Sequence, residues 1–297
     1  MTEPTNKGRG PALVRDTLTP ALFVVLWSTG FIGAKLGLPH AEPFTFLFLR
    51  FAILAVLLTV VALVLRAPWP ADRAAVGRMV VAGLMVHGAY LGGVFAGIHW
   101  GVPAGLAALI VGVQPLLTAV AAGPVLGERV TGRQWLGLMI GLAGVVLVLW
   151  DKLSLNREHA VGVAFCLFAL VGITAGTLYQ KRHGAAMDLR TGSAIQFAAA
   201  AVPMGLLALA FETRVVEWTG SFIFALAWLV VVLSLGAISL LYILIRRGAA
   251  SKVASLFYLV PPVTAVIAYF LFGETLGPAA ILGMGLAVVG VALVTKG

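Results

Sequence analysis

The sequence predicts an all-α membrane protein of ten transmembrane helices, built as two inverted five-helix repeats with the N- and C-termini in the cytoplasm. Three observations lead to this prediction: the composition, the spacing of the apolar runs, and an internal repeat. Of the 297 residues, 61% are hydrophobic and 10% are charged, and the mean hydropathy is +1.06. A soluble domain carries about 25% charged residues, so we expect a multi-pass integral membrane protein.

Ten apolar runs are long enough to span the hydrocarbon core of a bilayer, which takes about 20 helical residues. The first run is too long for a signal-peptide core and lacks a convincing Ala-x-Ala cleavage site, so we expect a retained helix. The short connections leave no room for a soluble catalytic or ligand-binding domain. The runs lie at residues 18–37, 44–65, 77–98, 103–123, 132–150, 160–180, 189–211, 222–245, 252–272 and 277–295.

The positive charges between the runs predict the orientation. If the N-terminus is cytoplasmic, fifteen Lys and Arg residues lie in cytoplasmic segments and four lie on the other side, which is the positive-inside pattern. The net charge of +9 and the pI of 10.2 therefore reflect topology, and we expect no binding to nucleic acid. We expect a cytoplasmic tail at residues 1–16, a first repeat at 17–151 and a second repeat at 158–297.

The two halves of the chain resemble each other when they are aligned with an offset of 146 residues. Residues 105–148 and 251–294 then align without a gap and share fourteen identical pairs among 44 positions, including Pro115 with Pro261. Each half contains five helices, an odd number, so the second half must cross the membrane in the opposite direction. Inverted repeats of this kind are found in transporters, and they predict alternating access around a shared site.

Prolines interrupt the fourth and ninth predicted helices at matched positions. Pro115 lies in one helix, and Pro261 and Pro262 lie in the other. Proline removes a backbone donor and disturbs the carbonyl four residues earlier, which is costly in hydrocarbon unless neighbouring helices, hydroxyls or cavity water satisfy the freed groups. We therefore predict helix kinks at these prolines, lining a central cavity. The alternative is that each proline only bends its helix for packing.

Two segments, residues 112–149 and 248–294, each contain a proline-bearing helix that ends in Gly-Glu and is followed by a glycine-spaced helix. This pattern resembles the EamA repeat of the drug/metabolite transporter superfamily. The segment WSTGFIGAKLG at 27–37 is similar to the first helix of that family, and Arg50 matches an arginine of its second helix. The resemblance covers nearly the whole chain. It implies a ten-helix exporter of amino acids and related metabolites, similar to the aromatic amino-acid exporter branch.

The Gly-Glu motif places Glu128 and Glu274 at the ends of the proline-bearing helices. In an inverted arrangement the two carboxylates lie on opposite sides of the membrane, in different chemical surroundings. A shared role as ion or proton sites is therefore the weaker interpretation. We expect both residues to be structural and to cap the N-terminus of the helix that follows, where negative charge is favoured.

None of the eleven Asp and Glu residues lies in the middle of a predicted helix. Proton-driven transporters usually use buried carboxylates or histidines as relays, so a carboxylate-coupled antiport has little support. His87 is the remaining relay candidate, although a neutral histidine bonded to a neighbour is the simpler expectation. We therefore predict facilitated movement down the substrate gradient.

Two cations within or near apolar runs allow two interpretations. Lys35 and Arg50 could bind a substrate carboxylate inside the membrane. Both also lie within reach of the non-cytoplasmic surface, since a long side chain can carry its charge to the interface. We expect the second behaviour for each of them.

Polar and aromatic side chains near helix centres are the candidates for the cavity wall. The pairs His87/Tyr90 and Ser239/Tyr242 have i, i+3 spacing, which predicts that each pair shares one helical face. Hydroxyls bonded to their own backbone, or rings packed between helices, are the alternative. The set predicts an apolar, aromatic-lined site with few charges, suited to zwitterionic or apolar metabolites. The predicted cavity residues are Trp27, Ser28, His87, Tyr90, Gln114, Thr118, Thr174, Tyr179, Ser239, Tyr242 and Tyr258.

Motifs of other protein classes are missing from the sequence. It contains no zinc-protease, P-loop, nucleophile-elbow or potassium-filter motif. The single cysteine, Cys166, rules out an intramolecular disulfide and a Cys-rich metal site. We therefore expect neither an enzyme nor a bound metal or cofactor. Gly-x-x-x-Gly spacings such as Gly137/Gly141 permit close helix contact; packing within a monomer is the simpler expectation, and a dimer stays open.

The sequence therefore predicts an alternating-access transporter of a bacterial inner membrane, with a small-molecule substrate and the lipid bilayer as its partners. The expected substrates are amino acids with aromatic or apolar side chains. Two alternatives remain open: a multidrug or other metabolite carrier, and a membrane sensor or scaffold that moves no solute.

Overall fold

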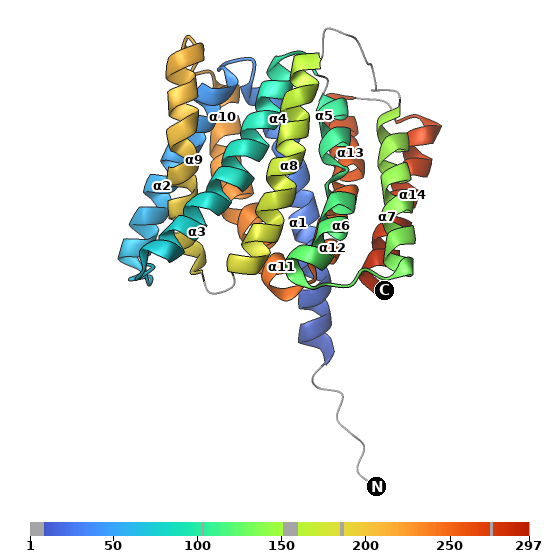
Figure 1. Ribbon diagram of the computed structural model, residues 1–297. Coiled ribbons are helices and arrows are strands. Elements are labelled where there is room, and N and C mark those ends of the chain that lie inside the picture. The colour runs from blue at the N-terminus through green and yellow to red at the C-terminus, as the bar shows by residue number, and fades with distance from the viewer. Residues whose placement is uncertain (1–8, 103, 151–159, 185–186, 274–275, 297) are drawn as a thin grey trace.

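The computed structural model describes residues 9–102, 104–150, 160–184, 187–273 and 276–296. Within these ranges, ten helical segments are long and apolar enough to span a bilayer, and their ends differ from the predicted ones by a few residues. The predicted all-α membrane fold is therefore confirmed. The start of α1 (Arg9–Gly37) and the end of α14 (Pro278–Lys296) lie on the same side of the molecule, the lower side in Figure 1.

Each repeat contains five spans in the same order. In the first repeat, the first two spans are α1 and α2 (Pro43–Val64). The third span consists of α3 (Arg73–Gly83), η1 (Leu84–Ala89) and α4 (Tyr90–His99). The fourth span consists of α5 (Ala104–Val111) and α6 (Gln114–Leu126), and the fifth is α7 (Gly132–Leu149). In the second repeat, the first two spans are α8 (Ala160–His183) and α9 (Leu189–Phe211). The third span consists of α10 (Gly220–Trp228), η4 (Leu229–Ala237) and α11 (Ile238–Arg247). The fourth span consists of α12 (Ala250–Ser255), η5 (Leu256–Leu259) and α13 (Val260–Phe272), and the fifth is α14.

The third and eighth spans each contain a π-helical segment. These segments, η1 and η4, occupy positions that the 146-residue offset brings into register. π-Helical turns are rare, and they are frequent at functional sites. The repeat therefore includes an irregular feature that hydrophobic patterning alone does not reveal.

Each proline-bearing span is divided into separate helical segments near its prolines, where the sequence predicts kinks. Pro115 lies in the first turn of α6, which a short turn separates from α5. Pro261 and Pro262 lie in the first turn of α13, directly after the 3₁₀ segment η5. Proline is tolerated there because the first turn of a helix needs no intrahelical donor. The Phe257 carbonyl, which Pro261 cannot satisfy, accepts a hydrogen bond from the Val260 N–H.

The expectation that Glu128 caps the following helix is wrong. The cap of α7 is Thr131, whose hydroxyl accepts from the Gln134 N–H while the Gln134 side chain accepts from the Thr131 N–H. Glu128 accepts a hydrogen bond of 2.9 Å from the N–H of Ala250, the first residue of α12 in the other repeat. The carboxylate serves a helix N-terminus that only the fold brings near. Glu274 lies outside the described residues.

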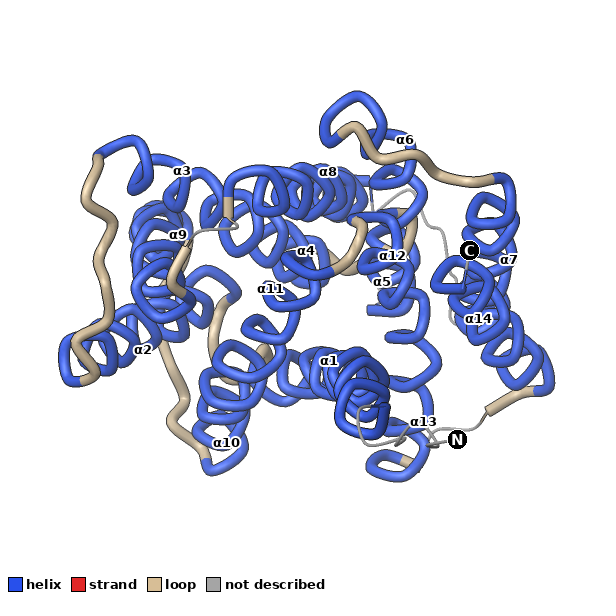
Figure 2. The backbone as a smooth tube through the Cα atoms, turned by 90° about the horizontal axis from the view of Figure 1, so that it is seen from below, coloured by secondary structure: helices blue, strands red, loops and turns tan. Residues whose placement is uncertain are grey.

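Helices α7 and α14 pack side by side at one edge of the molecule (Figure 2). A Cβ added to Gly137 would lie 2.7 Å from the Gly290 carbonyl oxygen, and a Cβ added to Gly290 would lie 2.6 Å from the Gly137 carbonyl oxygen. Gly144 and Gly283 approach each other in the same reciprocal way. As the residue number rises along α7 it falls along α14, so the two helices are antiparallel, as inverted repeats require.

Two carboxylates join the ends of α2 and α9 on the upper side of Figure 1. Glu212 accepts hydrogen bonds from the N–H groups of Phe44 (2.7 Å) and Thr45 (2.6 Å) and from the Thr45 hydroxyl (2.7 Å). Glu42 accepts from the N–H (2.6 Å) and the hydroxyl (2.5 Å) of Thr213. These five residues are named the upper joint below. Each repeat contributes one of its carboxylates.

Candidate functional site

A small buried cavity lies between the repeats. Helices α1, α2 and α4 with segment η1 of the first repeat, and segments η4 and α11 of the second repeat, form its wall. Its volume is about 40 Å³, which is room for roughly three water molecules, so the space is too small for an amino acid in this structure. Of the predicted cavity residues, Trp27 and Tyr90 line it. Together with Arg50, they are the described lining residues whose side chains carry polar atoms.

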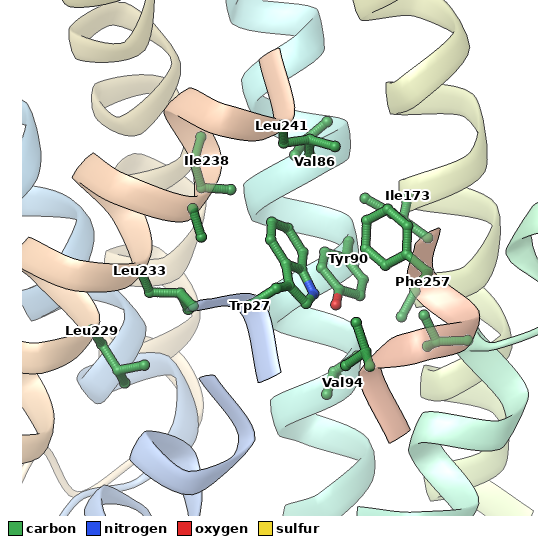
Figure 3. Close-up of a cluster of buried hydrophobic side chains, with 14 of the residues drawn as sticks. Trp27, Val86, Tyr90, Val94, Ile173, Leu229, Leu233, Ile238, Leu241 and Phe257 are labelled. Atoms are coloured by element: carbon green, nitrogen blue, oxygen red, sulfur yellow. The ribbon is translucent and has the colours of Figure 1, made fainter. Parts of the chain in front are cut away.

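Trp27 lies at the centre of an aromatic wall (Figure 3). Its ring is nearly parallel to that of Tyr90, with centroids 6.4 Å apart and 13° between the planes, and it meets the Phe257 ring edge-on at 5.1 Å. Phe23 contacts both the Trp27 and the Phe257 rings. The indole N–H of Trp27 interacts with the Tyr90 hydroxyl. Because α1 carries Trp27 and η5 carries Phe257, the two repeats build this wall together.

Arg50 does not reach the membrane interface, which corrects the expectation from its position. The residue is 1% exposed, and its Nε and Nη2 donate to the Ser234 hydroxyl oxygen at 3.2 and 2.9 Å. The Ser234 hydroxyl in turn donates to the carbonyl of Leu229, five residues earlier in η4, at 3.0 Å. The acceptor for the guanidinium therefore comes from the opposite repeat, which the sequence around Arg50 cannot show. Lys35, by contrast, is exposed.

His87 belongs to a separate polar group, named the lower network: His87, Gln180, Gln196 and Tyr242. The Tyr242 hydroxyl donates to Gln196 Oε1 and lies 3.3 Å from His87 Nε2. Gln196 Nε2 donates to Gln180 Oε1 at 3.1 Å. Because the Tyr242 proton points to Gln196, the proton of the imidazole lies on Nε2, and the buried Nδ1 has no hydrogen-bond partner. The ring stacks on Phe197 at 4.2 Å. This geometry suits a neutral histidine bonded to a neighbour.

The i, i+3 spacing of His87 and Tyr90 does not bring the two side chains to one site. His87 contacts Tyr242 in the lower network, whereas Tyr90 lines the cavity beside Trp27. The i→i+5 bonding of η1 widens the turn around His87, so α-helical spacing no longer predicts a shared face. Ser239 is half-buried and belongs to neither group, although Tyr242 is fully buried.

A second pocket, of about 190 Å³, lies at the lower ends of α3, α8 and α9. Gln180 and Gln196 of the lower network line it, together with the predicted residue Tyr179. Along the third span, residues 75–82 face this pocket and residues 86–98 face the cavity. His87 lies at the boundary, so the lower network lies between the two spaces.

Five predicted cavity residues remain, and four of them form hydrogen bonds with neighbouring groups. Ser28 and Thr174 each donate, at 2.7 Å, to a carbonyl four residues earlier in the same helix. Gln114 Nε2 donates to the Thr118 hydroxyl at 3.3 Å. The Tyr258 hydroxyl is buried and has no hydrogen-bond partner in the described part of the chain. These side chains are buried, and none of them is among the described residues that line the cavity or the second pocket.

Sequence reasoning missed several side chains that the structure brings to these sites. Gln180 and Gln196 gave a usable signal, because each is a polar residue in a predicted membrane span. Ser234 gave the same signal within the eighth span. Phe257 gave none, because an apolar ring in an apolar run does not indicate which neighbour it faces.

Comparisons with known proteins identify the family. The pattern described as the EamA-like transporter family matches residues 18–150 and again residues 160–296, one copy for each repeat. The resemblance found in the sequence is thereby confirmed.

Bacterial transporters are similar over nearly the full chain. An uncharacterized transporter, YvbV of Bacillus subtilis (strain 168), is 30% identical, with 94% of this chain and 91% of the relative covered. A probable amino-acid metabolite efflux pump of Escherichia coli (strain K12) is 27% identical, with 93% of each chain covered. A probable terminal-alkyne amino-acid exporter of Streptantibioticus cattleyicolor is 27% identical, with 93% and 91% covered.

A solved crystal structure supports the same fold. It superposes with a TM-score of 0.79 at 21% sequence identity, and the match covers 95% of this chain and 98% of that chain. At this identity the likeness shows the fold alone. Because the family pattern covers both repeats, the chain belongs to the EamA-like transporter family and is a multi-pass membrane transporter.

Proposed function

We propose that this protein exports amino acids with aromatic or apolar side chains across a bacterial inner membrane by facilitated, alternating-access transport. The observation that carries the proposal is the small aromatic cavity, whose wall comes from both repeats and, among the described residues, contains one cation, Arg50. An apolar wall with few polar groups suits a ligand with a large apolar part and little charge. The names of two relatives, an amino-acid metabolite efflux pump and an amino-acid exporter, support the same substrate class.

Contacts on the two sides of the cavity support alternating access. The upper joint ties α2 to α9, and the lower network ties η1 to α8, α9 and α11. Each group links the first repeat to the second. In the proposed cycle one group opens while the other stays closed, so that the cavity faces one side of the membrane at a time.

The position of the charges supports facilitation. The carboxylates whose side chains the structure describes lie at helix ends and in loops: Glu42, Asp72, Glu128, Asp188, Glu212 and Glu217. His87, the remaining relay candidate, is bonded within the lower network and has no carboxylate partner among the described residues. A proton relay through the membrane normally needs such groups. The simplest cycle therefore runs down the substrate gradient.

Counterflow through the reconstituted protein tests the proposal. Proteoliposomes loaded with unlabelled phenylalanine are placed in labelled phenylalanine, tryptophan, leucine, glutamate or lysine, at two pH values and without an ion gradient. We expect exchange of the aromatic and apolar amino acids at both pH values and little exchange of glutamate or lysine. Protein-free liposomes are the control.

Two results would contradict the proposal in different parts. Uptake that requires an imposed proton gradient would overturn facilitation and leave the substrate class intact. Absence of exchange for every amino acid, with saturable movement of a cationic dye, would favour a multidrug carrier.

A further inference from the structure

Arg50 is a buried cation without a counter-charge in the described part of the chain. It lies seven residues inside α2, roughly 10 Å from the upper end of that helix, and is 1% exposed. Two ion pairs within the described part of the chain join His40 to Glu217 and Arg190 to Asp188, and neither includes Arg50. Burying a charge without a partner is costly, so this position needs an explanation.

The hydrogen bonds of Arg50 leave much of the guanidinium unused. A guanidinium has five N–H donors in a fixed fork. Two of them, on Nε and Nη2, point at the single hydroxyl oxygen of Ser234. The remaining three donors have no acceptor among the described residues, and Arg50 lines the cavity. Ser234 thus orients the guanidinium and keeps its position fixed while part of the fork stays available.

The surroundings restrict which anion this fork can take. Guanidinium groups bind carboxylates and phosphates in a bidentate manner. A phosphate carries nearly two negative charges at neutral pH, whereas Arg50 is the one cation among the described residues that line this cavity. The rest of the wall consists of aromatic and aliphatic side chains, with Trp27 and Tyr90 next to each other. A single carboxylate attached to an apolar or aromatic group matches both the charge and the wall.

We propose that Arg50, oriented by Ser234, binds the carboxylate of the transported molecule, while Trp27 and Tyr90 contact its aromatic or apolar part. This inference rests on the proposed function and narrows it: the carboxylate is required for recognition, and the amino group is not. Because the cavity holds roughly three water molecules in this structure, the rings must separate to admit a substrate, and the guanidinium stays at the back of the opened site.

Competition by matched analogues tests the inference on the wild-type protein. Labelled phenylalanine counterflow is measured with 3-phenylpropionate, which lacks the amino group, and with phenethylamine, which lacks the carboxylate. We expect 3-phenylpropionate to compete and phenethylamine to compete at least about tenfold less well, since charge-assisted bonds of this kind are worth that factor or more. Equal competition by the two analogues would overturn the inference while leaving amino-acid transport in place.

Variants of Arg50 test whether this residue causes the preference for the carboxylate analogue. In Arg50→Gln we expect the preference for 3-phenylpropionate to disappear, and in Arg50→Lys, which keeps the charge without the fork, we expect part of it to remain. Arg247→Gln, at an exposed arginine, is the matched control and should keep the full preference. A preference that survives in folded Arg50→Gln would contradict the assignment, and the wild-type competition decides the question if that variant does not fold.

Thermal unfolding distinguishes failure of this inference from failure of the proposed function. Suppose that no amino acid is transported, and that 3-phenylpropionate raises the unfolding temperature but phenethylamine does not. This result would support the carboxylate site and contradict the transport proposal. If neither analogue raises it and neither competes, the carboxylate site falls.

Discussion

Tyr242 holds parts of three helices together through one hydroxyl group. It is fully buried on α11, donates to Gln196 on α9 and lies 3.3 Å from His87 Nε2 on η1. A buried hydrogen bond matters most when its loss leaves the former partners unsatisfied. At the residue scale, the lower network therefore depends on this hydroxyl.

Removing that hydroxyl should destabilise the protein. We expect Tyr242→Phe to lower the free energy of unfolding by about 1–3 kcal/mol, because Gln196 and His87 lose a buried partner. Thermal unfolding in detergent measures the effect. Tyr269→Phe, at an exposed ring, is the matched control and should stay within about 0.5 kcal/mol of the wild type. Equal effects in the two variants would show that the lower network does not stabilise the fold.

The Glu42 carboxylate of the upper joint should make stability depend on pH. The hydrogen bonds from Thr213 hold the pKa of Glu42 below its ordinary value of 4.5. A lowered pKa in the folded state gives stability that is fully present above pH 4.5 and is lost as the pH falls through the lower folded value. The contribution should not exceed about 1 kcal/mol, since the group is partly exposed.

Comparison of the wild type with Glu42→Gln measures this contribution. We expect the wild type to unfold at a higher temperature at neutral pH, and the difference to shrink as the pH falls from about 5 to about 3. A difference that grows on acidification would contradict the assigned direction of the pKa shift.

At the element scale, the contact between α7 and α14 depends on glycines that the repeat duplicates. Gly137 and Gly290 face each other, as do Gly144 and Gly283, and each would place a Cβ within 3 Å of backbone atoms of the other helix. Small residues allow this approach in a membrane, where helices associate by close packing rather than by the hydrophobic effect.

Two alanine substitutions on the same helix test this contact. In Gly290→Ala, the new Cβ would lie 2.5 Å from the Gly141 backbone nitrogen, whereas nothing lies within 4 Å of a Cβ at Gly285. We expect Gly290→Ala to destabilise by about 1–3 kcal/mol and Gly285→Ala to be neutral or stabilising by up to about 1 kcal/mol, because alanine favours the helix. Thermal unfolding compares them, and similar values would argue against close packing at this interface.

At the scale of the whole molecule, the antiparallel contacts between the repeats predict which loops share a side of the membrane. The loop after the fourth span and the loop after the seventh span must lie on opposite sides. Arg129 in the first loop and Glu217 in the second are both exposed. The positive-inside pattern adds that the side of Arg129 is the cytoplasm.

Cysteine labelling tests both statements. Cys166, the single native cysteine, is buried, so Cys166→Ala gives a background without thiols. In intact cells, we expect a membrane-impermeant maleimide to label Glu217→Cys and to label Arg129→Cys only after the membrane is opened. Labelling of both positions in intact cells would contradict the inverted arrangement, and the reverse pattern would contradict only the orientation.

The sequence by itself determined the number of spans, the two repeats and the interrupted helices. Each of these depends on local or periodic properties: a run of apolar residues must span a fixed thickness, and Pro115 and Pro261 lack a backbone N–H donor whatever segments pack around them. These properties act along the chain, so they can be read without knowing which segments meet.

Only the tertiary structure decided which groups share a site. Arg50 turned inward because Ser234 of the other repeat supplies an acceptor, Glu128 bonds to Ala250 rather than to the next helix, and the π-helical turn of η1 separates His87 from Tyr90. The physical reason is that hydrogen bonds and ring contacts act over a few ångströms in space. Partners more than a hundred residues apart therefore become neighbours only when the two repeats fold against each other.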